Sequence, residues 1–389
     1  MNAAAVPYWR ISSFYFFYFA MLGAWLPFWP LYLRELGYGA AAIGTLAGIL
    51  QGTKIIAPNI WGWLADRSGQ RVRIIRLGAF AAIAIFSTIF LRHDFAALIL
   101  IVAGYSFFWN AVHAQFEVVA IAHLRERVQR YSLLRVWGSI GFICAVAGLG
   151  FYFDHHSLLQ LPIIVCMLLF GIWCSSLVVA EPELQPAVAQ VRGSLREVLR
   201  QPTLIVFLFS SFLLQLSHGP YYTFFSVYLE AHGYARTQTG LLWSFAVVAE
   251  VVLFLLMPRL LARFALRPIL LASLLLAVLR WLLIGWFVDY LPVLLFAQCL
   301  HAATFASYHA AAIEIVRRLF PVHPGQGMGL YSGFSYGAGA ASGALLSGIF
   351  WVISPLATFI GAALIALLAA ALVWYFVSSE MLGDERAIC

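Results

Sequence analysis

Apolar residues fill most of the chain in long runs, which short charged breaks separate. Each run has roughly the 20 residues that an α-helix needs to cross a bilayer. The pattern predicts twelve membrane-spanning helices, at about 11–33, 40–61, 74–91, 95–122, 133–153, 158–179, 203–229, 238–258, 268–287, 291–314, 326–350 and 354–377. The first run is too long for a cleavable signal peptide and has no small-residue cleavage site, so we expect it to stay as a span.

One long polar break, residues 180–202, divides the predicted spans into two sets of six. We interpret it as a cytoplasmic linker between an N-terminal six-helix bundle (1–179) and a C-terminal one (203–389). The two halves are related, because a shift of 196 residues aligns Gly44 with Gly240 and His113 with His309, among other pairs. Parallel repeats of six spans are typical of transporters whose halves rock around a midplane site. The predicted fold is therefore all-α and integral to the membrane, with two pseudo-symmetric bundles.

Composition and charge agree with this picture. The chain is 63% hydrophobic and only 10% charged, which excludes a water-soluble protein. Of the 23 basic residues, 17 lie at the termini and even-numbered breaks, 3 lie at the other breaks and 3 lie inside spans. The positive-inside rule places both termini in the cytoplasm of a multi-pass protein of a bacterial-type inner (plasma) membrane. The net charge of +7 thus reflects topology, and the expected partner is the lipid bilayer and not nucleic acid.

Motifs of enzyme chemistry are missing from the sequence. The five cysteines form no CxxC pair, and no P-loop, HExxH, GxSxG or EF-hand pattern occurs. We expect no cofactor, no metal and no enzymatic activity. An intramembrane enzyme would have only His301 and His309 as a weak hint, and the internal repeat argues against it.

The break between the second and third spans carries the most specific motif. It reads Gly62-Trp63-Leu64-Ala65-Asp66-Arg67-Ser68-Gly69-Gln70-Arg71 and resembles the G-x-L-a-D-r-x-G-r-r signature of the major facilitator superfamily. We expect Gly62 to permit close helix packing, Gly69 to form a tight turn, and Asp66 to pair across the two halves in one conformation, as a latch. Arg67 and Arg71 complete this motif; the alternative is an ordinary basic loop. In the second half, the equivalent segment Pro258–Arg263 lacks the acid.

Five charged residues lie inside predicted spans: Lys54, Glu117, Arg135, Glu250 and Arg280. A charge at the bilayer centre costs at least about 2.5–3.5 kcal/mol, so each is a candidate functional residue. Lys54 and Glu250 are 196 residues apart and therefore equivalent in the two halves. They could pair across a cavity or each bind substrate; a purely structural ion pair is the alternative.

Glu117 is followed by a basic loop and then by Tyr131-x-x-x-Arg135-x-Trp137-Gly138-Ser139-x-Gly141. This region resembles the phenylpropionate permease family and, more distantly, the lactose permease-type proton symporters. The resemblance implies that Glu117 and Arg135 form a substrate-binding pair, and an arginine fork suits a carboxylate or vicinal hydroxyls. We add His113 and Tyr221 as substrate-binding candidates. Alternatively, Arg135 lies near the cytoplasmic mouth of its span, and His113 is a packing residue.

Arg280-Trp281 and Cys299-Leu300-His301 extend the resemblance, which implies a part in proton coupling. Thr304 stands where lactose permease carries an acid, so that coupling circuit does not transfer unchanged. We expect Glu250 to be the proton acceptor, with His301 and Arg280 modulating it, because protonation of a buried carboxylate depends on the cation beside it.

Together the resemblance implies a monomeric proton symporter that imports a small organic solute by alternating access, with an aromatic monocarboxylate such as 3-phenylpropionate as the leading substrate. A sugar or nucleoside symporter is the alternative. Drug efflux ranks below both, because the G-x-x-x-G-P-x-x-G-G motif of efflux proteins is absent between Gly138 and Gly150. Aromatic residues of the first and seventh spans could stack on a substrate ring or face lipid.

Overall fold

The computed structural model describes residues 7–124, 130–182 and 198–378. Its helices are α1 (Tyr8–Glu35), α2 (Ala40–Ser68), α3 (Arg71–Phe86), α4 (Phe95–Leu124), α5 (Tyr131–His155), α6 (Leu161–Leu177), α8 (Pro202–Ser217), α9 (Gly219–Ala231), α10 (Arg236–Arg263), α11 (Leu266–Trp286), α12 (Leu291–Ala302), α13 (Tyr308–Leu319), α14 (Pro324–Ser332), α15 (Ala340–Trp351) and α16 (Pro355–Phe376). Short 3₁₀ segments η1 (Ser87–Phe90) and η3 (Leu158–Gln160) and π-helical segments η4 (Ala303–Ser307) and η5 (Gly333–Gly339) join some of them.

The predicted all-α membrane fold is confirmed. Eleven helical segments of the described chain are long and apolar enough to cross a membrane. The remaining predicted span, the eleventh (326–350), is the continuous run α14–η5–α15, which is helical but rich in Gly and Ser and hence less apolar. The predicted seventh span is two helices, α8 and α9, which meet at His218 because Pro220 begins a new first turn.

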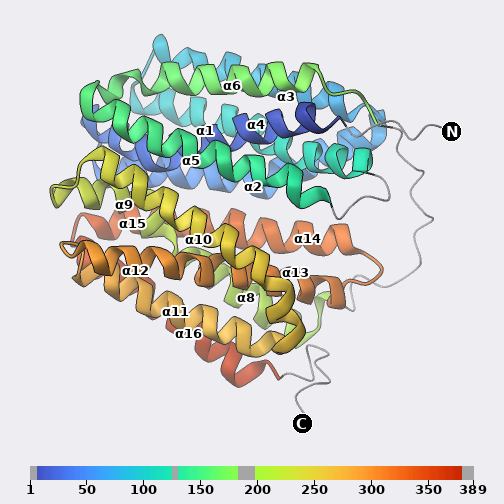
Figure 1. Cartoon of the computed structure of the whole chain (residues 1–389), viewed down its shortest axis with the longest axis vertical. Helices are drawn as coiled ribbons and strands as arrows, with labels where there is room; N and C mark the ends of the chain where they lie inside the picture. The colour runs from blue at the N-terminus through green and yellow to red at the C-terminus, as the bar shows by residue number, and fades with distance from the viewer. Residues whose placement is uncertain (1–6, 125–129, 183–197, 379–389) are drawn as a thin grey trace.

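Helices α1 to α6 form one bundle and α8 to α16 form a second, and the two lie along each other (Figure 1). Helices α2 and α5 of the first bundle pack on α15 and α10 of the second. The predicted linker 180–202 lies mostly outside the described residues, so its role stays a prediction.

Two close helix crossings join the bundles. A Cβ atom on Gly44 of α2 would lie 2.7 Å from the Cα of Gly348 on α15, so only glycine fits there. Likewise, Gly240 of α10 lies against the backbone carbonyl of Val146 on α5. Gly44 and Gly240 are the residues that the 196-residue shift aligns, so the repeat in the sequence corresponds to a repeat in the packing.

The turns after the first span of each bundle, α1 and α8–α9, repeat as well. Gly37 and Gly233 have φ angles of 88° and 81°, in the left-handed region that glycine adopts without strain. The tyrosine after each glycine donates a hydrogen bond to a loop carbonyl, from Tyr38 to His93 at 2.6 Å and from Tyr234 to Val288 at 2.8 Å.

The bundles pack together at one end of the molecule and part toward the other. The first halves of α2 and α10 contain most of their buried residues, whereas their second halves contain few and end at the largely exposed segments Ser68–Arg71 and Arg259–Arg263. We call this second end, which carries these arginines, the basic end. A groove lined by Ile55 and Asn59 of α2 and by Gln326 and Gly329 of α14 lies between the bundles there. The structure is therefore closed at the opposite end.

Candidate functional site

Glu117 is the centre of a polar group on the first bundle. On α4, His113 Nε2 lies one turn away, 3.2 Å from Glu117 Oε1. Across the α4–α5 break, Arg135 Nε lies 3.6 Å from the same oxygen, and the Tyr131 hydroxyl donates to Oε2. The structure thus brings together the three predicted residues His113, Glu117 and Arg135. We call these residues, with Tyr131, the N-terminal wall.

The Arg135 guanidinium rests on aromatic rings of α1. Its central carbon lies 4.1 Å from the centroid of the Phe19 ring and 5.7 Å from that of Tyr15. A Cβ atom on Gly138 would lie 2.6 Å from Phe19, so the glycine leaves room for the ring beneath Arg135. Cation–π contact and the Glu117 pair together fix the orientation of a side chain that stays 36% exposed.

On the second bundle, Glu250 and His301 form a pair. Glu250 Oε2 on α10 lies 3.7 Å from His301 Nε2 at the end of α12, and both side chains are largely buried. The predicted Lys54–Glu250 pair is absent from the described structure, where the partner of Glu250 is His301. Lys54 itself is half-buried on α2 and forms no ion pair or hydrogen bond with any other described residue.

Arg280 is fully buried in the second bundle. Its Nε donates to the Ala297 carbonyl at 3.0 Å, its Nη2 donates to Gln298 Oε1 at 3.1 Å, and its guanidinium lies over the Tyr221 ring at 4.0 Å. Tyr221 also donates to Gln298, at 3.2 Å. In the described chain Arg280 forms no ion pair with Glu250. The expected effect of Arg280 on the protonation of Glu250 must therefore act over a distance or through intervening residues.

Sequence reasoning missed Gln298, which holds Arg280 and Tyr221 together. The available signal was a glutamine within an apolar span, three residues before His301 and so on the same helix face. Tyr221, predicted as a substrate ligand, lies fully buried against Arg280.

The π-helical segment η4 separates His301 from His309. His309 Nδ1 lies 3.0 Å from the Tyr336 hydroxyl and 3.3 Å from that of Tyr331. Tyr336 belongs to η5, the second π-helical segment. Such segments are frequent at functional sites because they shift side chains relative to regular helix positions. We call Glu250, Arg280, Gln298, His301 and His309 the C-terminal wall.

The two walls face each other. Arg135 is close enough for its charge to act on both Glu250 and His309 of the opposite bundle, yet no ion pair joins the walls within the described residues. Together with Lys54 they form what we call the central site. It contains three cationic side chains (Lys54, Arg135 and Arg280) and two carboxylates, with Glu117 and Glu250 already paired.

The Gly62–Arg71 motif lies at the basic end, and its polar contacts are within the first bundle. Gly69 has a φ of 66° and ends α2, which confirms the predicted tight turn. Asp66 forms an ion pair with Arg71 of the same bundle, and Arg71 Nη1 donates to Gln115 Oε1 at 2.5 Å. A Cβ atom on Gly62 would make only an ordinary contact, so close packing at this glycine is not needed in this conformation.

Arg67 of the motif and Glu181 beside it also lie at this end. Arg67 is exposed, and its guanidinium lies 5.6 Å from the Trp63 ring. Glu181, just before the undescribed part of the linker, accepts hydrogen bonds from the first two backbone N–H groups of α3, on Arg71 at 2.9 Å and Val72 at 2.8 Å. Glu181 therefore caps α3. The predicted latch role of Asp66 across the bundles stays a prediction, because its partner here lies within one bundle.

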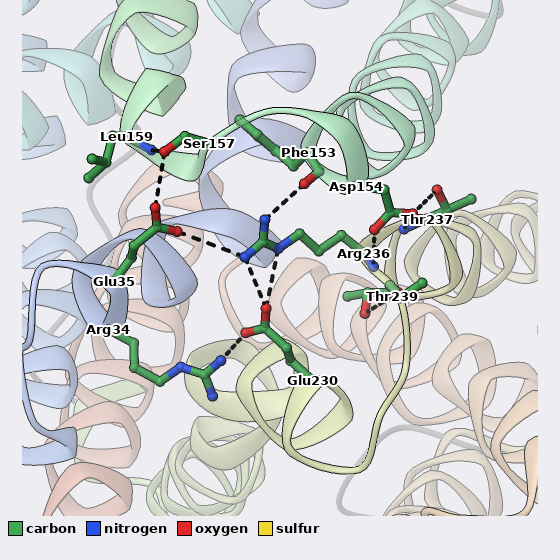
Figure 2. Close-up of polar contacts among 11 residues, drawn as sticks. Arg34, Glu35, Phe153, Asp154, Ser157, Leu159, Glu230, Arg236, Thr237 and Thr239 are labelled. Carbon is green, nitrogen blue, oxygen red and sulfur yellow. Dashed lines mark hydrogen bonds and ion pairs between the residues drawn. The ribbon is translucent and has the colours of Figure 1, made fainter.

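A second polar group, at the closed end, was not anticipated as a site (Figure 2). Arg34 of α1 pairs with Glu230 of α9. Arg236 Nη2 of α10 lies 3.1 Å from Glu230 Oε1 and 3.8 Å from Glu35 Oε2. Asp154 of α5 accepts from the backbone N–H of Arg236 at 2.8 Å. These five residues, which we call the inter-bundle cluster, join the two bundles; the signal in the sequence was that Arg34 and Glu230 are opposite charges 196 residues apart.

Two bundles of helices long and apolar enough to span a membrane, with charged side chains between them, are the arrangement of a transporter of the major facilitator type. The chain belongs to the MFS_1 like family, whose model matches residues 8–361. This family is not enzymatic, so the protein is a transporter and not an enzyme.

Several proteins are similar to the chain over most of its length. The "Probable 3-phenylpropionic acid transporter" of Escherichia coli (strain K12) is 29% identical, over 88% of this chain and 93% of its own. The maltose permease of Geobacillus stearothermophilus is 26% identical, over 92% and 93%. A crystal structure of the nucleoside transporter NupG superimposes with a TM-score of 0.82, at 17% identity and over 95% of this chain and 99% of the other, which shows the shared fold.

Proposed function

We propose that the protein is a proton-coupled symporter that imports a small organic anion by alternating access, with an aromatic monocarboxylate such as 3-phenylpropionate as the leading substrate. In this proposal both termini are cytoplasmic, so the basic end faces the cytoplasm and the structure represents an inward-open state. The observation that carries the proposal is the charge of the central site, where three cations face two carboxylates.

An excess cation in the membrane favours an anionic substrate. Isolated charge at mid-membrane costs at least about 2.5–3.5 kcal/mol, and Lys54 has no counter-ion in the described chain. A substrate carboxylate would supply one. A neutral sugar or nucleoside would leave Lys54 without a counter-ion.

Proton coupling follows from the same charge count. The bundles must change conformation both empty and fully loaded, and a bound carboxylate with one proton gives the loaded site the same net charge as the empty one. Glu250 is the proposed proton acceptor, because it is a largely buried carboxylate whose one ion-pair partner among the described residues is His301, at 3.7 Å. Binding of the anion alone would change the charge, which makes the proton the natural partner of the substrate.

Sugar symport is the second candidate. A relative with 26% identity is a maltose permease, and an arginine fork such as that of Arg135 also binds vicinal hydroxyls. Nucleoside transport has the same chemical basis, because the ribose of a nucleoside also offers vicinal hydroxyls to Arg135.

The decisive experiment is uptake into proteoliposomes with an inwardly directed proton gradient. We expect saturable accumulation of radiolabelled 3-phenylpropionate above that of protein-free liposomes, and no accumulation of maltose or uridine. The protein-free control is needed because aromatic acids cross bilayers unaided in their neutral form. Saturable accumulation of maltose or uridine without that of 3-phenylpropionate would overturn the proposed substrate class.

A further inference from the structure

Tyr131 begins the sequence motif that contains Arg135, and neither the predicted site nor the proposed function gives it a role. It is the half-buried first residue of α5, and its hydroxyl donates a hydrogen bond to Glu117 Oε2. Arg135 follows four residues later and so lies on the same face of α5, about 6 Å further along the helix axis. Two side chains of one helix face therefore reach the same carboxylate on α4.

The three contacts of the Glu117 carboxylate differ in kind. Tyr131 donates the one hydrogen bond that this carboxylate accepts from a side chain of the described residues. Arg135 Nε lies 3.6 Å from Oε1, which is an ion-pair distance beyond hydrogen-bonding range. His113 Nε2 lies 3.2 Å from the same oxygen but outside hydrogen-bond geometry. Glu117 is therefore anchored to Tyr131 and only loosely paired with Arg135.

This arrangement leaves the N–H groups of Arg135 available. Arg135 donates no hydrogen bond to any other described residue, and its side chain is 36% exposed. The Phe19 ring, 4.1 Å from the guanidinium carbon, supports the side chain without using an N–H group. An arginine fork binds a carboxylate best through two parallel hydrogen bonds. Glu117 would itself occupy the fork in this way if its carboxylate were free to turn.

We propose that Tyr131 is a positioning residue, which holds Glu117 off the Arg135 fork and so keeps that fork open for the substrate carboxylate. The inference rests on the proposed function, with the predicted ligand Arg135 binding the substrate. Tyr131 acts through Glu117 and does not need to touch the substrate. Glu117 stays close enough to offset the charge of Arg135 in the empty site, where an isolated charge within the membrane would be costly.

The test compares half-saturation constants for 3-phenylpropionate in an exchange assay, which needs no proton gradient. In Tyr131→Phe, Glu117 can close onto Arg135, and the substrate must displace it. We expect the half-saturation constant to rise about 10- to 100-fold, because a hydrogen bond between charged groups must first break, while the maximal exchange rate stays unchanged. Tyr8→Phe is the matched control and should change neither value, because the Tyr8 hydroxyl donates to the Leu133 carbonyl of α5, at 3.2 Å, and not to Glu117.

A second substitution separates positioning from direct contact with the substrate. Glu117→Gln removes the competing carboxylate, so the double variant Tyr131→Phe, Glu117→Gln should have the same half-saturation constant as Glu117→Gln alone. A direct contact between Tyr131 and the substrate would instead raise the constant equally with and without Glu117, which would overturn the inference. An unchanged constant in Tyr131→Phe would overturn it as well.

A structure of Tyr131→Phe tests the same point without any substrate. The Glu117 carboxylate should then lie within hydrogen-bond distance of two guanidinium nitrogens of Arg135. A carboxylate that keeps its present distance from Arg135 would overturn the inference. Absence of 3-phenylpropionate exchange in the wild-type protein would instead overturn the proposed function, and the structure of Tyr131→Phe would still decide the role of Tyr131.

Discussion

Replacement of Glu230 by Gln should shift the conformational equilibrium away from the closed-end arrangement seen here. Glu230 lies in the second bundle, and its carboxylate pairs with Arg34 of the first. It also holds Arg236, which reaches Glu35 of the first bundle at 3.8 Å. The Arg34–Glu230 and Arg236–Glu35 pairs can exist only while the two bundles touch at this end, so their loss favours the opposite-facing state.

The expected size of this conformational shift follows from the solvent exposure of the paired side chains. The Arg34 and Glu230 side chains are 40% and 23% exposed, so solvent screens their pair, and we assign it about 1 kcal/mol, the upper end for exposed ion pairs. That corresponds to about a fivefold change in the ratio of the two states. Adding Asp154→Asn should increase the effect, but less than additively, because Asp154 and Glu230 both act on Arg236.

Spin labels at Leu91 and Tyr290 would report the shift. Both positions are exposed (81% and 62%), lie outside the inter-bundle cluster and belong to different bundles. We expect the population with the longer label separation to rise about fivefold in Glu230→Gln. Asp94→Asn is the matched control, because the two partners of the Asp94 side chain among the described residues, Arg92 and the backbone N–H of Ala97, lie within three residues of it in the same bundle. Identical distance distributions in Glu230→Gln, Asp94→Asn and wild type would refute the reasoning.

Three further variants probe other contacts. Glu250→Gln should abolish proton-driven accumulation in proteoliposomes but preserve substrate exchange, because it removes the proposed proton acceptor. Undiminished accumulation would show that Glu250 is not needed for proton coupling. Glu181→Gln should destabilise the protein by about 1 kcal/mol, because its carboxylate caps α3 through two backbone N–H groups, and an unchanged denaturation midpoint would contradict this. If Asp66 pairs across the bundles in the other state, Asp66→Asn should increase the population with the shorter distance between the Leu91 and Tyr290 labels, which is the conformation described here. A decrease in that population would contradict the latch prediction.

Much of the fold was predictable because a bilayer imposes strict rules on sequence. Every span needs a long apolar run, and all twelve predicted runs correspond to helical segments of the structure. The repeat at a shift of 196 also had structural meaning, since the aligned Gly44 and Gly240 lie at equivalent crossings. The break in the predicted seventh span was less predictable, because Pro220 at the start of a helix and Pro inside one look alike in the sequence.

The candidate site was predictable where partners are neighbours on one helix or on consecutive helices. Glu117, His113 and Arg135 meet as expected, because the reversal between α4 and α5 brings them together. The contact of Glu250 with His301 agrees with the expectation that His301 modulates Glu250. Whether Lys54 also pairs with Glu250 depends on how far apart the bundles lie, and no single-sequence pattern encodes that separation.

The inter-bundle cluster illustrates the same limit. Arg34 and Arg236 are two of the three basic residues at the sparsely charged breaks between the predicted spans. Their partners Glu230 and Glu35 lie at span ends, where charged residues are common, so spacing alone gave no reason to single them out. The opposite charges of Arg34 and Glu230 at equivalent positions were the one available sign, and it becomes informative only once the two bundles are known to face each other.

Proton movement driven by the substrate tests the central claim most directly. Proteoliposomes containing the wild-type protein, with a pH-sensitive dye inside, receive 3-phenylpropionate outside, and protein-free liposomes and Glu250→Gln proteoliposomes serve as controls. We predict internal acidification that is saturable in substrate and faster than in both controls. Acidification at the protein-free rate, together with saturable uptake of labelled 3-phenylpropionate, would contradict proton-coupled symport.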